Sequence, residues 1–176
     1  MKTRLIITLI GILFHLNINA QNYIYKGSEQ FEATNTWSFI LNGHYWSTDP
    51  TIVVARHSNG GYLMLSIEVP FESHFIKGNL TIILEDGNMI NCVDRNFRDY
   101  VDNTSTNLYN LTLDEIEKMK NSRISKVRFN ICVQNYRMKD EIKPFTATNN
   151  NDKFNSDFEE IDYYETDVEI SNLFEE

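Results

Sequence analysis

Histidines and cysteines are the side chains of this sequence most able to bind a metal or act as nucleophiles. Beyond residue 20 there are three histidines, His44, His57 and His74, and two cysteines, Cys92 and Cys132. Three histidines are enough to hold a zinc ion, but paired zinc ligands normally stand only a few residues apart. These spacings match no compact metal motif, so we predict turn or surface histidines, no metal site and no cofactor.

Sequence motifs for nucleophilic catalysis are also absent. The chain contains no Gly-x-Ser-x-Gly elbow, no His-Glu-x-x-His pair and no glycine-rich loop of the phosphate-binding kind. A cysteine paired with a histidine would make a thiol nucleophile, but both cysteines fall within predicted strands, where a structural role is the usual one. The sequence therefore assigns no catalytic residue and favours a protein without catalytic activity over an enzyme.

A group of aromatic side chains gives the sequence its candidate binding site. Trp37, Tyr45 and Trp46 lie close together in the chain, with His44 among them. Exposed aromatic rings stack on sugar rings or anchor protein interfaces, so these four residues are predicted to bind a ligand. The alternative interpretation places Trp37 and Trp46 in the hydrophobic core, where large aromatic side chains dominate burial.

Alternation of apolar and polar residues predicts a protein made mainly of β-strands. Runs rich in β-branched and aromatic residues are bounded by Asn-Gly, Asp-Gly and Pro, which mark hairpins and strand ends. The predicted strands cover residues 37–41, 51–56, 62–69, 79–84, 89–93 and 124–133. In the hairpin around Asp86 and Gly87 we expect Leu84 to lie opposite Met89, which turns Cys92 away from the main core.

One helix is predicted within the sheet region and a second near the C-terminus. Thr112 and Glu115 form a capping box for a helix over residues 113–121. Thr166 and Glu169 allow another capping box before a short docking helix. The apolar residues of that second helix, at helical spacing, are Ile170, Leu173 and Phe174. The predicted fold class is α+β: mainly an antiparallel β-sheet or sandwich of about six or seven strands, with one inserted helix and a short C-terminal helix.

The two cysteines are candidates for a disulfide bond. An exported chain meets an oxidising environment, and sequential strands are neighbours in a sheet about two-thirds of the time. If strands 89–93 and 124–133 are neighbours, Cys92 and Cys132 lie close enough to bridge beneath the helix. The alternative is two buried free thiols, which pack as small hydrophobic groups.

The first twenty residues have the composition of a secretory signal peptide. Lys2 and Arg4 precede an apolar run, residues 5–14, and a short polar stretch leads to Ala20. The run is too short for a membrane-spanning helix, which needs about 20 residues. We expect cleavage after Ala20, a mature chain with no membrane span, and a secreted or periplasmic location.

Acidic residues gather at the C-terminal end of the chain. The net charge is −9, and residues 152–176 contain ten acidic side chains and one basic one, Lys153. Nucleic acid is not expected as a partner, because binding it requires a basic face. The expected organisation is a signal peptide at 1–20, one β-rich domain at 21–145, and an acidic segment at 146–176 that begins with a polar linker.

Three segments of the chain carry a family resemblance. They are DGNMINCVDR at residues 86–95, LYNLTLDEI at 108–116 and SRISKVRF at 122–129. The first contains a hairpin turn, the second a helix cap and the third the start of a strand. In these three features the chain resembles uncharacterised small exported proteins of Bacteroidetes-type bacteria. The resemblance implies an exported domain of sheet and helix, and it carries over no functional residue.

The sequence favours an exported, non-catalytic binding or interaction module whose partner is an unknown protein or a glycan. Two alternatives stay open. One is a hydrolase that acts on an extracellular polymer. The other is an inhibitor or immunity-type protein that presents its acidic tail to a basic partner. The oligomeric state does not follow from the sequence.

Overall fold

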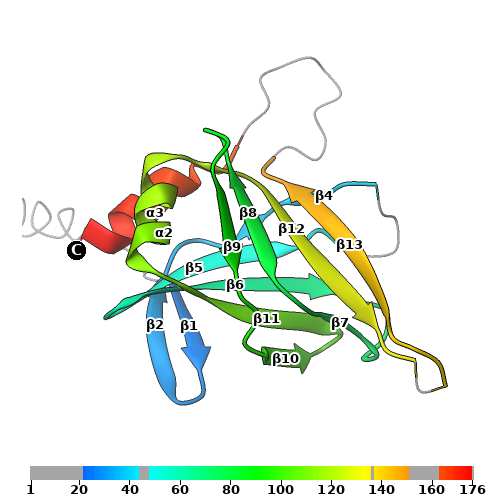
Figure 1. Cartoon of the computed structure of the whole chain (residues 1–176). Helices are drawn as coiled ribbons and strands as arrows, with labels where there is room; N and C mark the ends of the chain where they lie inside the picture. The colour runs from blue at the N-terminus through cyan, green and yellow to red at the C-terminus, as the bar shows by residue number, and fades with distance from the viewer. Residues whose placement is uncertain (1–21, 44–47, 136, 151–162, 176) are drawn as a thin grey trace, which may run out of the picture.

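The fold is α+β and mainly antiparallel, as predicted, with one helix inserted between strands and another at the C-terminal end. The computed structural model describes residues 22–43, 48–135, 137–150 and 163–175. Within these residues the strands form two sheets, one of seven strands and one of six. Figure 1 shows the sheets packed against each other, with both helices at one end.

The seven-stranded sheet is ordered β1-β2-β5-β6-β11-β10, with β3 also paired to β5. All its pairs are antiparallel. Its strands are β1 (Asn22–Lys26), β2 (Glu29–Ala33), β3 (Trp37–Ser38), β5 (Thr51–His57), β6 (Gly60–Glu68), β10 (Phe97–Val101) and β11 (Thr104–Leu111). The β5–β6 hairpin, predicted from its Asn-Gly turn, runs in continuous register from Thr51↔Ser66 to His57↔Gly60.

The six-stranded sheet is ordered β4-β13-β12-β8-β9, with β7 also paired to β12. Its strands are β4 (Ile40–Leu41), β7 (His74–Ile76), β8 (Leu80–Leu84), β9 (Met89–Cys92), β12 (Ile124–Val133) and β13 (Glu141–Thr148). The run predicted as one strand at 37–41 is divided between the two sheets, because Phe39 separates β3 from β4 and is fully buried.

The main hydrophobic core lies between the inner faces of the two sheets. It contains Ile52, Leu63 and Leu65 from one sheet and Ile82 and Phe129 from the other. Successive side chains of a strand point to opposite faces, so the alternate residues of the first sheet face outward. On that outer face a smaller cluster forms where the β1–β2 hairpin folds over β5 and β6. This cluster consists of Ile24, Val53, Ala55, Tyr62 and Leu108, with Phe31 packed against it.

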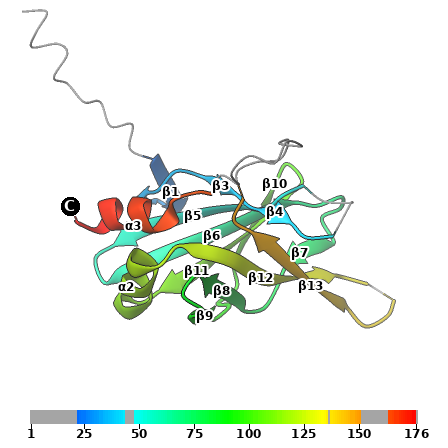
Figure 2. The ribbon, with the colours of Figure 1, turned by 90° about the horizontal axis from the view of Figure 1, so that it is seen from above.

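Helix α2 (Leu113–Asn121) has the predicted bounds and the predicted capping box. Glu115 N donates to Thr112 Oγ1, and Thr112 N donates to the Glu115 carboxylate at 2.8 Å. Ile116 and Met119 turn the buried face of the helix toward the core. Figure 2 shows α2 beside the second helix, α3 (Thr166–Glu175), at the same end of the sheets.

Helix α3 exists, but the predicted capping box of Thr166 and Glu169 is wrong. Thr166 Oγ1 instead accepts a hydrogen bond from Ile124 N at 2.9 Å, at the start of β12. The Glu169 carboxylate accepts from Trp37 Nε1 and from Asn35 N, both at 3.0 Å. The side chains that suggested a local cap therefore fasten the helix to the two sheets.

The start of the stretch predicted as a polar linker from residue 146 belongs to the fold instead. Residues 146–148 are the end of β13, paired with β12 up to Lys126↔Thr148. Asn149 is buried, and its amide donates to Ile124 O and Tyr164 O while its Oδ1 accepts from Tyr164 N. Residues 151 and 152, the end of the predicted linker, lie outside the described residues.

The register predicted for the Asp86-Gly87 hairpin is wrong by one residue. Met89 lies opposite Ile83 rather than Leu84, and Cys92 lies opposite Leu80. Gly87 N donates to Leu84 O and Leu84 N donates to Asn88 O, so the turn has three residues rather than four. Because a slip of one residue reverses both faces of a strand, Ile90 and Cys92 point into the main core.

Candidate functional site

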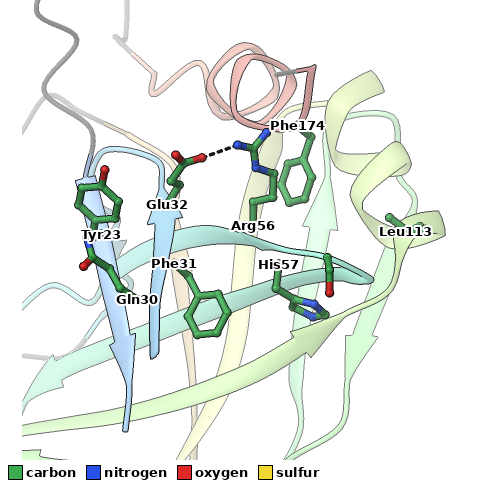
Figure 3. A pocket seen from close by; sticks show the side chains of 9 residues that line it. Tyr23, Gln30, Phe31, Glu32, Arg56, His57, Leu113 and Phe174 are labelled. Atoms are coloured by element: carbon green, nitrogen blue, oxygen red, sulfur yellow. Dashed lines mark hydrogen bonds and ion pairs between the residues drawn. The ribbon is translucent and has the colours of Figure 1, made fainter. Parts of the chain in front are cut away.

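A groove of about 700 Å³ lies where the β1–β2 hairpin, the β5–β6 turn and the two helices approach one another. We call it the hairpin groove. Figure 3 shows the side chains that line it: Glu32 and Arg56 point toward each other beside Phe174, while Phe31 and His57 point to the other side of their strands. The lining residues are Tyr23, Gln30, Phe31, Glu32, Arg56, His57, Ser58, Leu113 and Phe174. Binding sites for small ligands commonly have a volume of this order.

The groove exists because β2 and β5 separate. Their ladder contains a single residue pair, Ala33↔Ala55, among the described residues. Beyond that pair, the remaining four pairs of β2 are made only with β1, at Glu32, Phe31, Gln30 and Glu29. Over the same stretch β5 continues toward its turn with β6. The hairpin therefore diverges from the sheet and leaves space between the two strands.

An ion pair spans this space. Arg56 Nη2 on β5 donates to Glu32 Oε2 on β2, and each side chain keeps about a third of its surface exposed, 29% for Arg56 and 32% for Glu32. The remaining guanidinium N–H groups and the second carboxylate oxygen are additional donors and acceptors. Because the lining contains one positive and one negative side chain, Arg56 and Glu32, its net charge is zero.

Aromatic rings form the wall below the ion pair. The Phe31 ring lies edge-on to Tyr62, with centroids 5.1 Å apart, and the His57 ring lies 4.7 Å from the same tyrosine. Asn59 N donates to His57 Nδ1 at 3.2 Å, so a neutral imidazole carries its proton on Nε2. Phe31 and His57 are both half-buried, and each leaves part of its ring exposed to the groove.

Two glycines hold the opposite wall close to the sheet. A Cβ on Gly60, which has a φ of +144°, would stand 2.3 Å from Leu111 O. A Cβ on Gly61 would stand 2.8 Å from Ala55 O and 3.1 Å from the Phe174 ring. The contacts with Leu111 O and Ala55 O are closer than a Cβ tolerates, so both positions require glycine. Glycine at position 61 also leaves room for the Phe174 ring against the strand.

Of the four residues of the aromatic site predicted from the sequence, only Trp37 lies among the described residues. Trp37 is fully buried and bonded to Glu169, so its core interpretation is correct and its assignment to a ligand-binding surface is wrong. His44, Tyr45 and Trp46 lie outside the described residues.

The other histidines do not come together. His57 lies at the end of β5, whereas His74 begins β7 in the other sheet. Burial and the positive charge of Lys143 lower the pKa of His74. Across the described ranges no three His, Cys, Asp or Glu side chains are placed to hold one metal ion.

The candidate disulfide does not form; both cysteines are buried free thiols, as in the alternative interpretation. Strand β8 separates β9 from β12, so the strands of Cys92 and Cys132 are not neighbours. Cys92 points into the main core, while Cys132 lies next to Ile131 in β12 and therefore points to the opposite face. Sγ of Cys132 contacts Asp140 Oδ2 at 3.7 Å on that face.

Sequence reasoning missed the residues of the hairpin groove. A turn signal was present, because Gly27 and Ser28 separate the aromatic segment 23–25 from Phe31, and a glycine between two such runs favours a hairpin. No sequence pattern connects that hairpin with Arg56 or with Phe174. Their proximity depends on the long-range pairing of the sheet and on the docking of α3.

A second polar cluster lies at the far side of the core, around Asp94. Its carboxylate accepts hydrogen bonds from Gly78 N at 2.7 Å, Asn96 N at 2.8 Å and Arg98 Nη2 at 2.9 Å. Asn107, which is fully buried, donates to the same carboxylate at 3.3 Å. These donors join a loop, a turn and two strands, so we interpret the cluster as a structural connection.

No helix in the part of the chain that the structure describes has both the length and the apolar character needed to cross a membrane. Comparisons of the chain with protein-family models, with curated proteins and with solved structures give no match.

Proposed function

We propose that the protein is an exported, non-catalytic binding module whose ligand occupies the hairpin groove. The observation that carries the proposal is the lining of this groove, which combines half-exposed aromatic rings with a partly exposed ion pair. Apolar surface with a few directed polar groups is the usual composition of a ligand site. Export is proposed from the N-terminal sequence, since residues 1–21 lie outside the described residues.

The construction of the groove supports binding. Its walls come from strands and helices that are fixed to the body of the protein, and sites on such elements hold their geometry well. Glu169 fastens α3 to Trp37, and the β5–β6 hairpin is fully paired. A ligand would therefore meet side chains that are already positioned, which lowers the ordering cost of binding.

The proposal is tested by blocking the groove. Ser58 is an exposed residue of the lining, whereas its neighbour Asn59 is exposed but does not line the groove. The labelled mature chain would be applied to arrays of oligosaccharides and of peptides, together with the variants Ser58→Trp and Asn59→Trp. We expect Ser58→Trp to lose binding of the probes that the unmodified protein retains, and Asn59→Trp to keep it.

Equal binding by all three proteins would contradict the proposal, because it would place the ligand outside the groove. Catalysis is examined with the same probes in solution. Appearance of new reducing ends or of peptide fragments would contradict a non-catalytic role and identify the hydrolase alternative instead.

A further inference from the structure

We infer that the ligand of the hairpin groove is a neutral saccharide, held by two adjacent hydroxyl groups at the Arg56–Glu32 pair. The inference rests on the proposed function of the groove as a binding site and adds the chemical class of the ligand. Three features of the lining support it: its charge balance, its mixture of donors and acceptors, and its aromatic rings.

Charge balance favours an uncharged ligand. The charged side chains of the lining are Glu32 and Arg56, which already neutralise each other through a hydrogen bond. An anionic ligand would compete with Glu32 for the guanidinium, and a cationic one would compete with Arg56 for the carboxylate. Either would leave a displaced charge with fewer partners in a partly desolvated place, which is unfavourable.

Hydroxyl groups match the polar atoms that the ion pair leaves available. A hydroxyl both donates and accepts, so one of two adjacent hydroxyls donates to the Glu32 carboxylate while the other accepts from Arg56. Hydrogen bonds to ionised groups are shorter and stronger than those between neutral groups. Gln30 adds an amide with both functions at the edge of the same groove.

Aromatic rings match the other surface of a sugar. The C–H groups on one face of a pyranose ring form an apolar patch, which packs against aromatic faces such as those of exposed tyrosine. Tyr23 is 41% exposed, and Phe31 and Phe174 are half-buried. Figure 3 shows Phe174 beside Arg56, on the same side of the strands as the ion pair, whereas Phe31 points to the other side. Tyr23 lies opposite Glu32 in the β1–β2 pairing, so Tyr23 and Phe174 are the rings that a sugar at the ion pair can contact.

The geometry disfavours an extended peptide. Peptides that add to a sheet need an accessible strand edge for backbone hydrogen bonds. Between β2 and β5, the Arg56–Glu32 ion pair crosses the space that such a strand would occupy. A wholly apolar ligand is disfavoured as well, because it would cover the ion pair without giving it hydrogen bonds.

The test uses isothermal titration of the mature chain with hexasaccharides of β-1,4-glucose, β-1,4-mannose and β-1,3-glucose, at up to about 10 mM. Chitosan and galacturonate hexamers serve as cationic and anionic probes, and a mixture of random heptapeptides serves as the peptide probe. We expect at least one neutral hexasaccharide to bind, and the charged hexamers to bind at least tenfold more weakly.

Matched variants locate the interaction. Tyr23→Ala removes a ring contact, and Glu32→Gln replaces a charged acceptor by a neutral, weaker one, so each should weaken saccharide binding roughly tenfold or more. Tyr25→Ala and Glu29→Gln are controls on the same hairpin, because Tyr25 and Glu29 are exposed and do not line the groove. The controls should change binding by less than about twofold. Thermal unfolding of each variant confirms that it is folded.

Three results would overturn the inference. Tighter binding of a charged hexamer than of every neutral one would contradict the inference that the ligand is uncharged. Peptide binding that Ser58→Trp abolishes, with no neutral saccharide bound, would overturn the saccharide but leave the groove as a binding site. If none of the probes gives binding that Ser58→Trp abolishes, both the saccharide and the proposed function are wrong.

Discussion

At the scale of single residues, the polar side chains inside the protein have separate tasks. Glu32 and Arg56 form a partly exposed ion pair, and such a pair contributes little to stability. Asp94 is much less exposed, at 10% of its side chain, and it accepts hydrogen bonds from four groups. Of these two groups, only the ion pair is available to a ligand. Only the Asp94 cluster is expected to contribute substantially to the free energy of unfolding.

The Asp94 cluster leads to the first prediction. Asp94→Asn should lower the free energy of unfolding by about 2–3 kcal/mol at pH 7, because buried donors lose a charged acceptor. Urea unfolding would measure the change. Asp102→Asn is the control, because Asp102 is exposed and its left-handed φ of +48° suits asparagine; it should change stability by less than about 0.5 kcal/mol.

The effect of Asp94→Asn should depend on pH. Burial raises the pKa of Asp94, but hydrogen bonds from Asn96, Gly78, Asn107 and Arg98 outweigh burial and hold the pKa below its ordinary value. A carboxyl with a lowered folded pKa stabilises the protein above its unfolded pKa, about 3.9, and loses this contribution as the pH falls through the folded pKa. The difference between wild type and variant should therefore be constant near neutral pH and shrink below about pH 4. A difference that grew on acidification would contradict this assignment.

The cysteines lead to the second prediction. Burial, with a further contribution from the negative charge of Glu115, raises the pKa of Cys92 to about 12. Burial also raises the pKa of Cys132. Because the thiolate is the reactive form, neither cysteine should react quickly with a thiol reagent in the folded protein. Unfolding without a reductant should release two reactive thiols per chain. A monomer that releases no reactive thiol on unfolding would contradict the free thiols and indicate a disulfide between Cys92 and Cys132.

At the scale of elements, helix α3 is held by a few specific contacts. Its residue Ile170 is fully buried. Thr166 accepts a hydrogen bond from the backbone of β12. Glu169 accepts one from Trp37 in β3 and one from the backbone of Asn35. The helix also supplies Phe174 to the groove. Loosening α3 should therefore affect both stability and binding.

The third prediction tests this attachment. Glu169→Ala removes the acceptor of the Trp37 indole and of Asn35 N. Leaving a buried donor without a partner costs about 1–3 kcal/mol. We expect a loss of that size in urea unfolding and faster hydrogen exchange in α3. Glu165→Ala, which changes an exposed residue just before the helix, is the control; an equal effect of the control would contradict the role of Glu169.

The elements also show how far sequence patterns extend. Helix α2 and strand β12 were predicted with their observed bounds, because a capping box and strict alternation are local signals. Strand β11 was missed because Ser105 and Asn107 point inward, where they bind Ile76 N and Asp94 instead of packing as apolar residues. The groove was missed for a different reason: its residues come from four segments whose proximity is decided by long-range pairing.

At the scale of the whole molecule, the two sheets and two helices form one body in which the hairpin groove lies at the end occupied by the helices. Six of the ten acidic side chains of residues 152–176 lie outside the described residues, so an inhibitory role for that segment stays a prediction of the sequence. The groove depends on strands from the start of the described chain and on a helix from its end, and both are needed to form it.

Export gives the fourth prediction. If residues 1–20 act as a signal peptide, the mature protein begins at Gln21, one residue before β1. Mass spectrometry of the protein recovered outside the cytoplasm should give this N-terminus. Recovery of the mature protein with Met1 intact would contradict cleavage.

The buried amide of Asn149 has a consequence for changes in the length of the chain. It pairs reciprocally with the backbone of Tyr164, so these two points of the chain are held next to each other. A longer connection there changes only the entropy of closing a loop, about 0.6 kcal/mol for each doubling of its length. Evolution or an engineer could therefore place an additional domain between these two residues while the sheets, the helices and the hairpin groove keep their positions.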